Sequence, residues 1–418
     1  MNDSMIALDD AQQIVLGQVS AMPAQEASLI EALGRVVARD LTSDIDVAPF
    51  DNSAMDGFAF HASDVESAES DQPVSLKLVA HIGAGDVYDK VVEDGQAVRI
   101  MTGAAVPAGC DTVQMIERVT FTGEGTVGDD VLIHSAVPVG KNIRNAGEEV
   151  RAGDVVMTSG TLLTAAGLGL LASTGNVRIP VYARPKVGII SLGSELVEAD
   201  AVPGPGKLRN ANSIALAGCV ADAGALPVMY PLVSDDEEAI RDAVRKAVAE
   251  CDFVVSSGGA SAGDYDYITQ VADSLGKVFF KYVNMRPGKS QTFAVIDGVP
   301  FLGLAGNPTS AVVGFEMLVR PALLKAQGRT CVFRPMQKAR LSREMHKHDS
   351  RPQYMRGRVV RDESGALIAI PEKRQSSALL ATLQRADSLI VFPGEVSDLL
   401  AGAEVDCVRI DQEPGAVL

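Results

Sequence analysis

RPKVGIISLGSEL (184–196) and, further along, DFVVSSGGASAGDYDY (252–267) are the stretches that decide the fold of this chain. In the first, the apolar run Val187–Leu192 lacks the alternation of a half-exposed strand, so we expect a central strand that is buried on both faces. A Gly-Ser turn that carries Glu195 follows it. In the second, a buried strand leads directly into a glycine-rich turn. Such strand and turn units, separated by a helical segment, are typical of an α/β fold.

The segment between these strands, SDDEEAIRDAVRKAVAE (234–250), predicts an amphipathic helix. Ser234 would be its N-cap, because Glu237 follows three residues later as in a capping box. Asp297-Gly298 predicts a hairpin turn, and Asn307-Pro308 suits the N-cap and first turn of a further helix. Residues 184–330 are therefore predicted to form an α/β domain with a mixed or parallel sheet and flanking helices.

Away from this centre the pattern changes on both sides. Helical periodicity over 8–22 and 28–41 predicts two N-terminal helices, and 161–175 predicts a buried helix. Short alternating runs separated by Gly, Pro and Asp predict a small β-rich domain near 73–145 and a terminal β domain from 331. The expected domains are 1–48 with 146–183, 49–145, 184–330 and 331–418.

Composition excludes several classes of protein. The 418 residues include 37 Lys and Arg against 54 Asp and Glu, a net charge of −17, which disfavours binding to nucleic acid or to an anionic membrane. A hydrophobic content of 47% is ample for globular cores. No apolar run is long enough for a membrane span, and the acidic N-terminus does not resemble a signal peptide. Five scattered cysteines without a Cys-x-x-Cys pair indicate reduced thiols, so we expect a cytoplasmic protein.

Carboxylates and cations occur together in the predicted loops. The carboxylates lie at 56, 148, 149, 195, 235, 236, 264 and 266, and the same loops carry Arg144, Arg286 and Lys289. Open α/β sheets bind ligands at the ends of their strands. Mg²⁺ prefers one or two carboxylates together with substrate phosphates, so this mixture suits Mg²⁺ and a phosphorylated substrate. Solvated turn and cap residues are the alternative interpretation of the same carboxylates.

Two glycine-rich motifs suggest other chemistries. Gly259-Ala-Ser261-Ala-Gly263 matches the G-x-S-x-G elbow of serine hydrolases, but the downstream histidines, His346 and His348, lie in the terminal β region. Backbone amides of the same turn could instead bind an anion. Pro287-Gly288-Lys289-Ser290 resembles the end of a P-loop, yet the first glycine of that motif would fall at Val283.

Seven segments together resemble a known family, the MoeA-type molybdopterin molybdenumtransferases, which include the E domain of gephyrin. The segments are PFDNSAMDGFA (49–59), VRIMTGAAVP (98–107), NIRNAGEEVRAGD (142–154), SLGSEL (191–196), SSGGASAGDYDY (256–267), MRPGKSQTF (285–293) and GLAGNPTSAV (303–312). The resemblance implies an elongated multi-domain chain with an inserted β-rich domain, a central molybdopterin-binding domain and a C-terminal β-barrel-like domain. It also implies that molybdate-derived molybdenum is inserted into adenylylated molybdopterin, with Mg²⁺-dependent release of AMP.

Residue roles follow from the resemblance alone. It implies catalytic roles for Asp56, Thr102, Arg144 and Glu149. It implies substrate binding by Glu195, Asp235, Gly258, Gly259, Ser261, Asp266, Arg286, Lys289, Pro308 and Ser377. Asp266 and Glu149 would lie near the Mg²⁺. A homodimer is implied because the family builds its site from two chains, and a molybdopterin adenylyltransferase is a possible transient partner.

Three positions depart from the family pattern. Glu149 replaces the usual Asp, Asn210 removes a charge after the first strand, and Ala305 replaces a proline before the helix. The second function hypothesis is therefore a non-catalytic molybdopterin carrier or scaffold on the same fold. A serine hydrolase that uses Ser261 is the third hypothesis.

Overall fold

The computed structural model describes residues 5–259 and 267–415. The chain divides into two compact units. Unit 1 comprises Met1–Glu26, Gly34–Ala38 and Pro180–Leu418, and unit 2 comprises Ala27–Leu33 and Arg39–Ile179. The predicted fold class is confirmed, because unit 1 holds an α/β body with a closed β-barrel and unit 2 holds a β-rich domain.

The α/β body of unit 1 is built on a six-stranded mixed sheet in the order β16-β13-β17-β20-β19-β18. Its strands are β13 (Lys186–Ser191), β16 (Leu226–Met229), β17 (Phe253–Ser257), β18 (Lys277–Tyr282), β19 (Ser290–Ile296) and β20 (Val299–Leu304). β13 is hydrogen-bonded on both sides by parallel partners, β16 and β17, as its continuous apolar run predicts. The hairpin between β19 and β20 is also confirmed. Asp297 and Gly298 both have positive φ, of 49° and 84°, as a type I′ turn requires.

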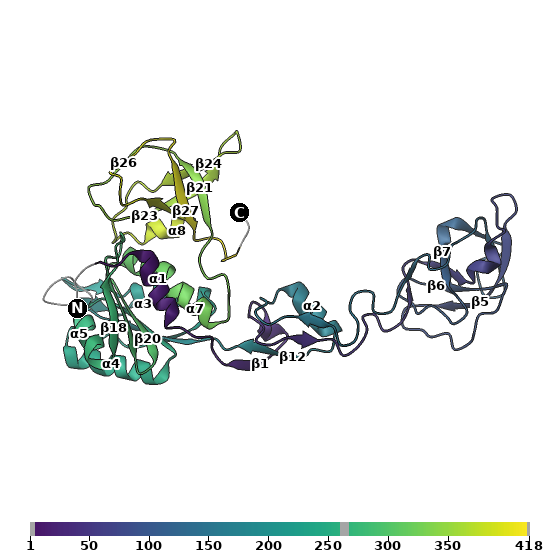
Figure 1. Ribbon diagram of the computed structural model, residues 1–418, viewed down its shortest axis with the longest axis horizontal. Coiled ribbons are helices and arrows are strands. Elements are labelled where there is room, and N and C mark those ends of the chain that lie inside the picture. The colour runs from purple at the N-terminus through teal and green to yellow at the C-terminus, as the bar shows by residue number, and fades with distance from the viewer. Residues whose placement is uncertain (1–4, 260–266, 416–418) are drawn as a thin grey trace. The chain divides into compact units, whose positions relative to one another are not determined.

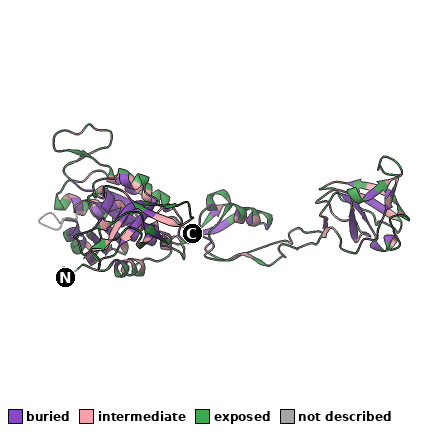
Figure 2. Ribbon diagram, turned by 90° about the horizontal axis from the view of Figure 1, so that it is seen from above, coloured by how far each residue is buried: buried purple, intermediate pink, exposed green. Residues whose placement is uncertain are grey.

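Helices cover both faces of this sheet (Figure 1). The first group is α1 (Leu8–Gly17), α3 (Asn212–Asp222), α6 (Pro308–Gly314), the π turn η4 (Phe315–Val319) and α7 (Arg320–Ala326). The second is α4 (Glu237–Glu250) and α5 (Tyr267–Leu275). Each group of helices encloses a hydrophobic core with one face of the sheet, and successive side chains of a strand point to opposite faces. Phe253 and Val255 therefore pack with the first group, and Val254 packs with the second. The buried interior and the exposed outer helix surfaces are distinguished by colour in Figure 2.

The start of α4 differs from the prediction. Its N-cap is Asp236, whose side chain accepts a hydrogen bond from the amide of Ala239, and not Ser234. Residues 234–236 instead form a tight turn, in which the carbonyl of Ser234 accepts a hydrogen bond from the amide of Asp236. Asp236 therefore takes the capping role two residues later, as its chemistry allows.

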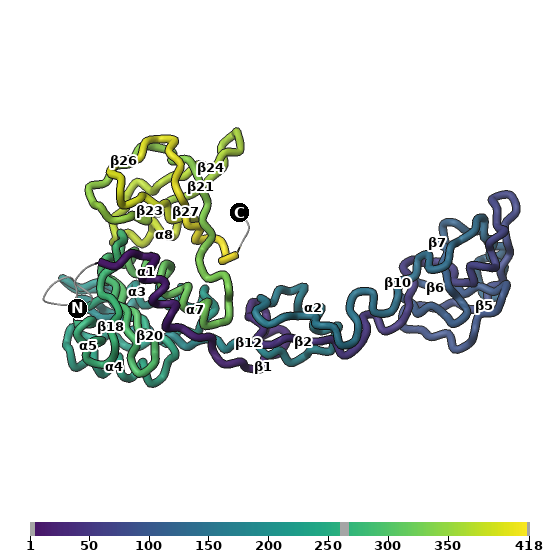
Figure 3. The backbone as a smooth tube through the Cα atoms, in the orientation of Figure 1, coloured from purple at the N-terminus to yellow at the C-terminus, as the bar shows by residue number. Residues whose placement is uncertain are grey.

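The C-terminal part of unit 1 is the barrel, whose strands run in the order β21-β24-β23-β25-β27 and close by pairing of β21 with β27 (Figure 3). Its strands are β21 (Met336–Leu341), β23 (Gln353–Arg361), β24 (Leu367–Pro371), β25 (Ser388–Phe392) and β27 (Glu404–Arg409), with the small pair β22 (Met345–His346) and β26 (Asp398–Leu399) and the short helix α8 (Ala381–Arg385). Met355, Ala369, Ile390 and Cys407 lie in its buried core. The predicted terminal β domain is thus present.

Unit 2 is dominated by a six-stranded sheet in the order β7-β4-β6-β5-β9-β8, which confirms the expected β-rich segment. Its strands are β4 (Gly57–Phe60), β5 (Val74–Ile82), β6 (Gln96–Ile100), β7 (Thr112–Met115), β8 (Val119–Phe121) and β9 (Asp130–Ile133). Shorter elements of this unit are β2 (Leu41–Thr42), β3 (Asn52–Ser53), β10 (Ile143–Arg144), β11 (Val155–Met157), η1 (Ile30–Ala32), η2 (Ala62–Val65), η3 (Ile116–Arg118) and α2 (Ala165–Ser173). The remaining strands of the chain are β1 (Ala24–Ser28), β12 (Arg178–Tyr182), β14 (Leu196–Val197) and β15 (Leu208–Arg209).

The prediction of a helix over 28–41 was wrong. Only the short turn η1 forms there, and Gly34 follows it with φ of 71°. The β-branched residues Val36 and Val37 then adopt an extended conformation, in which Val37 forms a bridge with Val181. The other N-terminal helix is confirmed as α1, which ends at Gly17.

α2 occupies the predicted 161–175 segment, but only part of it is buried. Leu168 and Leu171 are its buried residues, so the helix is less enclosed than its apolar sequence predicts. Gly175, with φ of 77°, follows the helix at its C-terminal end. Across residues 5–259 and 267–415, no helix combines the length and the apolar character that a membrane crossing needs.

Candidate functional site

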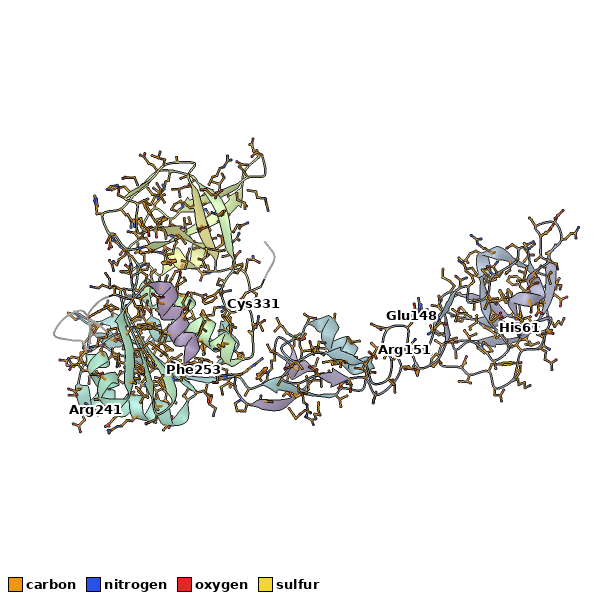
Figure 4. The ribbon with its side chains drawn as sticks, in the orientation of Figure 1. His61, Glu148, Arg151, Arg241, Phe253 and Cys331 are labelled. Atoms are coloured by element: carbon orange, nitrogen blue, oxygen red, sulfur yellow. The ribbon has the colours of Figure 1, made fainter. Side chains whose placement is uncertain are left out.

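The candidate site is a cleft of about 1160 Å³ in unit 1, at the carboxyl edge of the parallel strands. The chain passes from β13 to β16 on one side and returns to β17 on the other, so the strand order reverses between β13 and β17. Ligands of open α/β sheets bind at such a reversal. Phe253, labelled in Figure 4, marks the start of β17, and the strand ends at the cleft. Residues 351, 353–356 and 375–378 of the barrel region also line the cleft.

Two glycines bring the end of β17 close to the end of β13. Gly258 has φ of 94°, and a Cβ atom there would lie 2.2 Å from the carbonyl oxygen of Leu192. Gly259 has φ of 66°, and its Cβ would lie 2.9 Å from Leu192 Cδ1. Only glycine fits both the conformation and the space at 258. The turn therefore exposes backbone to the cleft, as an anion-binding turn requires.

Two predicted carboxylates, Glu195 and Asp235, line the cleft. Asp235 Oδ2 accepts a hydrogen bond of 2.9 Å from the amide of Ser194, and Ser194 Oγ accepts one of 3.2 Å from the amide of Asp235. This reciprocal pair fixes the turn after β13 and thereby the position of the neighbouring Glu195. Asp235 therefore has a structural role in the turn whether or not it also contacts a ligand.

Asparagines after β15 order the floor of the cleft. Asn212 Nδ2 donates hydrogen bonds of 2.7 Å to Ser257 Oγ and 2.7 Å to the carbonyl of Gly306, which joins the ends of β17 and β20. Asn210 is buried, and its Oδ1 accepts a hydrogen bond of 3.2 Å from the amide of Ser213 at the start of α3. Asn210 thus places a neutral side chain, hydrogen-bonded to the first turn of α3, in the cleft wall.

The Pro-Gly loop carries the predicted cations Arg286 and Lys289, both exposed and both lining the cleft. The Arg286–Pro287 peptide is cis. The barrel strand β23 holds this loop, because the amide of Arg286 donates to the carbonyl of Pro352 at 2.9 Å and its carbonyl accepts from the amide of Tyr354 at 2.7 Å. Arg286 Nη1 lies 3.6 Å from Asp349 Oδ2.

Asp349 is itself held by Arg351. Arg351 donates to both carboxylate oxygens, and this hydrogen bonding, with further attraction from Arg286, keeps the pKa of Asp349 well below its usual range. Asp349 therefore remains ionised and orients Arg286 at the mouth of the cleft.

Arg356 is a cleft residue that the sequence analysis missed. It is 1% exposed, and it donates hydrogen bonds from Nε to Thr382 Oγ1 at 3.1 Å and from Nη2 to the carbonyl of Ser376 at 3.0 Å. Burial lowers its pKa to about 10, so the guanidinium is still charged at neutral pH. No carboxylate of the described residues forms an ion pair with it. A buried, charged arginine at a cleft is suited to an anionic ligand.

Ser191 is a second missed residue of the cleft. Its hydroxyl is buried and has no hydrogen-bond partner in the described part of the chain. Both misses have the same cause, since a serine within a strand and an arginine within a β segment give no sequence signal of a ligand. Of the other predicted residues, Pro308 begins α6 and Ser377 accepts a hydrogen bond from the amide of Thr309, and both line the cleft.

Four predicted catalytic residues lie in unit 2. Asp56 Oδ1 accepts hydrogen bonds of 2.7 Å from both the amide and the hydroxyl of Thr102. These two bonds hold the pKa of the exposed Asp56 below its ordinary value. Arg144 lies on β10, which pairs with β3, and the loop that carries Asp56 directly follows β3. Glu149 is exposed and follows Glu148 on the segment that leads to Arg151 (Figure 4).

The remaining predicted residues, Ser261 and Asp266, lie outside the described residues. The histidines of the hydrolase hypothesis are engaged elsewhere: His346 Nδ1 lies 2.5 Å from Asp398 Oδ1, and its Nε2 lies 3.3 Å from His348 Nδ1. Neither histidine lines the cleft. Within 5–259 and 267–415, no group of three or more His, Cys, Asp or Glu side chains is arranged to hold a metal ion.

Three family descriptions match this chain in succession. They are the MoeA N-terminal region (domain I and II) over 6–175, a probable molybdopterin binding domain over 188–325, and the MoeA C-terminal region (domain IV) over 338–410.

Individual relatives match almost the whole length. A molybdopterin molybdenumtransferase of Staphylococcus aureus (strain COL) is 32% identical over 409 residues, 98% of this chain and 96% of the relative. The enzyme of the same name from Staphylococcus epidermidis (strain ATCC 35984) is 32% identical over 404 residues, 96% of this chain and 95% of the relative. Among solved structures, a molybdopterin biosynthesis MoeA protein from Pyrococcus horikoshii OT3 superposes with a TM-score of 0.81 at 29% identity, covering 97% of this chain and 100% of that one. The full-length similarity, the order of the matched regions and the cleft together show that the chain belongs to the MoeA family of molybdopterin molybdenumtransferases.

Proposed function

We propose that this protein inserts molybdenum from molybdate into adenylylated molybdopterin and releases AMP, as an enzyme of molybdenum cofactor biosynthesis. The observation that carries the proposal is the cleft at the strand reversal, where glycine backbone and cationic side chains meet carboxylates. The name of the relatives, which match this chain over almost its full length, supports the same reaction.

The charges of the cleft suit such a substrate. Arg286 and Lys289 at the mouth and the buried Arg356 would neutralise phosphate and molybdate oxygens. Gly258 and Gly259 would let the backbone approach the phosphates, and Ser191 Oγ would donate a further hydrogen bond. The pterin and adenosine parts would fill the remainder of the cleft, beside Glu195. Holding the substrate rigidly in this way is itself a large contribution to rate.

Mg²⁺ is a proposed cofactor, with molybdate as a substrate. Glu195 and Asp235 present carboxylates in the same cleft as the cations, and Mg²⁺ is bound in proteins by one or two carboxylates together with substrate phosphates. The donor set therefore fits, even though no larger carboxylate cluster occurs among the described residues. We also propose metal-ligand roles for Asp266 and Glu149. The Mg²⁺ ion would neutralise phosphate charge when bound.

In unit 2, we propose catalytic roles for Asp56, Thr102, Arg144 and Glu149. The two hydrogen bonds from Thr102 keep the Asp56 carboxylate ionised and fixed in orientation, which supports a role in proton transfer during the reaction. We also propose that Ser261 contributes a backbone amide to the phosphate site.

The larger organisation is proposed on the same basis. The four domains would be 1–48 with 146–183, 49–145, 184–330 and 331–418. The matched family regions end at 175 and 325 and resume at 188 and 338, and these two gaps support the boundaries at 183 and 330. We propose a cytoplasmic homodimer that receives its substrate transiently from a molybdopterin adenylyltransferase.

Release of AMP from purified protein supplied with adenylylated molybdopterin, molybdate and Mg²⁺ tests the reaction. We expect release to require all three components and to fall by at least about 100-fold in Asp56→Asn, because loss of a residue acting in proton transfer costs that much or more. Asp111→Asn, another loop carboxylate of unit 2, is the matched control and should retain activity. Tight substrate binding by the wild-type protein without AMP release would instead establish the carrier hypothesis.

A further inference from the structure

A second hollow lies on the outer side of the barrel and is not part of the cleft. It has a volume of about 640 Å³ and is formed by β23, β24, α8, the segment that leads to α8 and the turn after β21. None of its lining residues also lines the cleft. We call it the barrel groove, and its charged lining residues are Arg343, Arg358, Glu372, Lys373, Arg374 and Arg385.

The groove is strongly positive on a strongly negative protein. Five cationic side chains line it against the single carboxylate of Glu372, whereas the whole chain carries a net charge of −17. If the charged side chains of this surface served only to solvate the protein, carboxylates would outnumber cations here as they do in the whole chain. A local reversal of sign of this kind is the electrostatic signature of a site for an anion.

Internal pairing accounts for only part of this charge. Arg385 donates from Nε and Nη2 to the two carboxylate oxygens of Glu372, both at 3.2 Å, and Arg343 donates to the carbonyl of Glu372 at 3.3 Å. Arg385 and further arginines keep the pKa of Glu372 below its ordinary value. Arg358, Lys373 and Arg374 are exposed and form no ion pair with any described residue. Their charges are therefore available to a ligand.

The shape and lining of the groove narrow the choice of ligand. Its volume lies within the range of about 300–1000 Å³ that is typical of small-molecule sites. Ile370, Pro371 and Leu379 contribute an apolar floor between the cations. Arginine side chains bind phosphate oxygens in a bidentate fashion, and several of them together favour a ligand with more than one phosphate.

We propose that the barrel groove is a binding site for an oligophosphate, either free or as part of a nucleotide whose ring would lie on the apolar floor. The site is separate from the cleft but shares a wall with it. Thr382 lines the groove and accepts the hydrogen bond from Arg356, which lines the cleft. Gln375, another cleft residue, donates from Nε2 to the carbonyl of Glu372 at 3.0 Å. A ligand in the groove is therefore placed to influence Arg356.

Calorimetric titration of the full chain with inorganic triphosphate, and separately with ATP, tests the site. The groove variant is Arg358→Gln/Arg374→Gln. The matched control is Arg340→Gln/Arg361→Gln, which removes the same charge from exposed arginines of the same barrel outside the groove. A cleft variant, Arg286→Gln/Lys289→Gln, reports phosphate binding at the other site.

We expect saturable binding that weakens with added salt, falls by about 100-fold in the groove variant and persists in the control and in the cleft variant. That loss corresponds to about tenfold for each charge-assisted contact removed. Stronger binding of ATP than of triphosphate would identify a nucleotide, and equal binding would identify the phosphates alone as the ligand. Absence of saturable binding, or binding lost only in the cleft variant, would overturn the proposal. So would binding of a glutamate-rich peptide without binding of either phosphate ligand, since the groove would then be a protein-docking surface.

Discussion

Individual residues of the cleft combine two kinds of role, contact with ligand and maintenance of the turns that create the cleft. Asp235 illustrates the second role, because its carboxylate and the hydroxyl of Ser194 hold each other's backbone amides. Asn212 does the same between the ends of β17 and β20. Loss of function on mutation of such residues therefore requires a stability measurement before it is assigned to chemistry.

Gly258 provides a sharp test at this scale. In Gly258→Ala, the new Cβ would meet the carbonyl oxygen of Leu192 at 2.2 Å, in addition to the cost of about 1–2 kcal/mol for placing a side chain at positive φ. Gly298→Ala is the matched control, because φ there is 84° but no atom lies within 4 Å of the new Cβ. We expect Gly258→Ala to lower the free energy of urea unfolding more than the control does, and to abolish AMP binding. Equal destabilisation by the two substitutions would contradict the close approach.

At the scale of elements, the Pro-Gly loop depends on the barrel for its position. Backbone hydrogen bonds join Arg286 to Pro352 and Tyr354, and Asp349 lies between Arg286 and Arg351. The cations of the loop are thus presented by two elements that are distant in sequence. A change in the barrel can therefore alter phosphate binding without touching the loop.

The Asp349 cluster predicts a dependence of stability on pH. Because its folded pKa lies below the unfolded value of about 3.9, Asp349 contributes stability that is fully present above pH 4. That contribution is lost as the pH falls from about 4 through the lower folded pKa. We expect the difference in unfolding free energy between wild type and Asp349→Asn to be constant from pH 7 to 5 and to shrink below pH 4. Glu363→Gln, an exposed carboxyl in a turn of the same barrel that forms no ion pair among the described residues, controls for general acid effects. A difference that grew in acid would show that the sign is wrong.

A buried ionic network supports α7 and the segment after β27. Arg320 is 1% exposed and lies 2.8 Å from Asp222 and 3.1 Å from Glu413, while Arg334 lies 3.0 Å from Glu316. We expect Arg320→Ala to destabilise unit 1 by about 1.5–3 kcal/mol, the size of a lost hydrogen bond to a charged group, because Asp222 and Glu413 are exposed enough to be solvated once Arg320 is removed.

Thermal or urea unfolding of the Arg320 variant measures this effect. Lys338→Ala is the control, since Lys338 and its partner Glu404 are both exposed and such pairs contribute little. If both variants unfolded at the same denaturant concentration, the buried network would not stabilise the protein.

At the scale of the whole molecule, candidate residues are distributed over both units. Asp56 and Thr102 belong to unit 2, and Glu195 and Arg286 belong to unit 1. If the protein is the proposed homodimer with sites built from two chains, inactive variants of different units should complement each other. We expect a mixture of Asp56→Asn and Glu195→Gln, after exchange of subunits, to recover part of the AMP release that each lacks alone. A mixture of Asp56→Asn with Thr102→Val should recover none. Recovery in both mixtures, or in neither despite confirmed subunit exchange, would contradict a shared site.

The sequence by itself determined the strand and turn units, because their signals are local. The apolar run at 187–192, the Asp297-Gly298 turn and the Asn307-Pro308 helix start each depend on a few adjacent residues. The same locality explains the errors, since periodicity over 28–41 gave no sign that Val37 would bridge to Val181. The prediction of Ser234 as the N-cap of α4 likewise used only adjacent residues, and these do not show that Asp235 accepts a hydrogen bond from the distant amide of Ser194.

Only the tertiary structure decided which side chains share the cleft. Arg356 and Ser191 become site residues because a barrel strand and a strand of the sheet line the same cleft, where both side chains are buried. The barrel groove likewise gives no signal in the sequence, since its arginines come from β23, from the turn after β21, from the segment before α8 and from α8 itself. Burial and electrostatic fields depend on neighbours brought together from distant parts of the chain. A local pattern can therefore specify strands and turns, but it cannot specify where charge will accumulate.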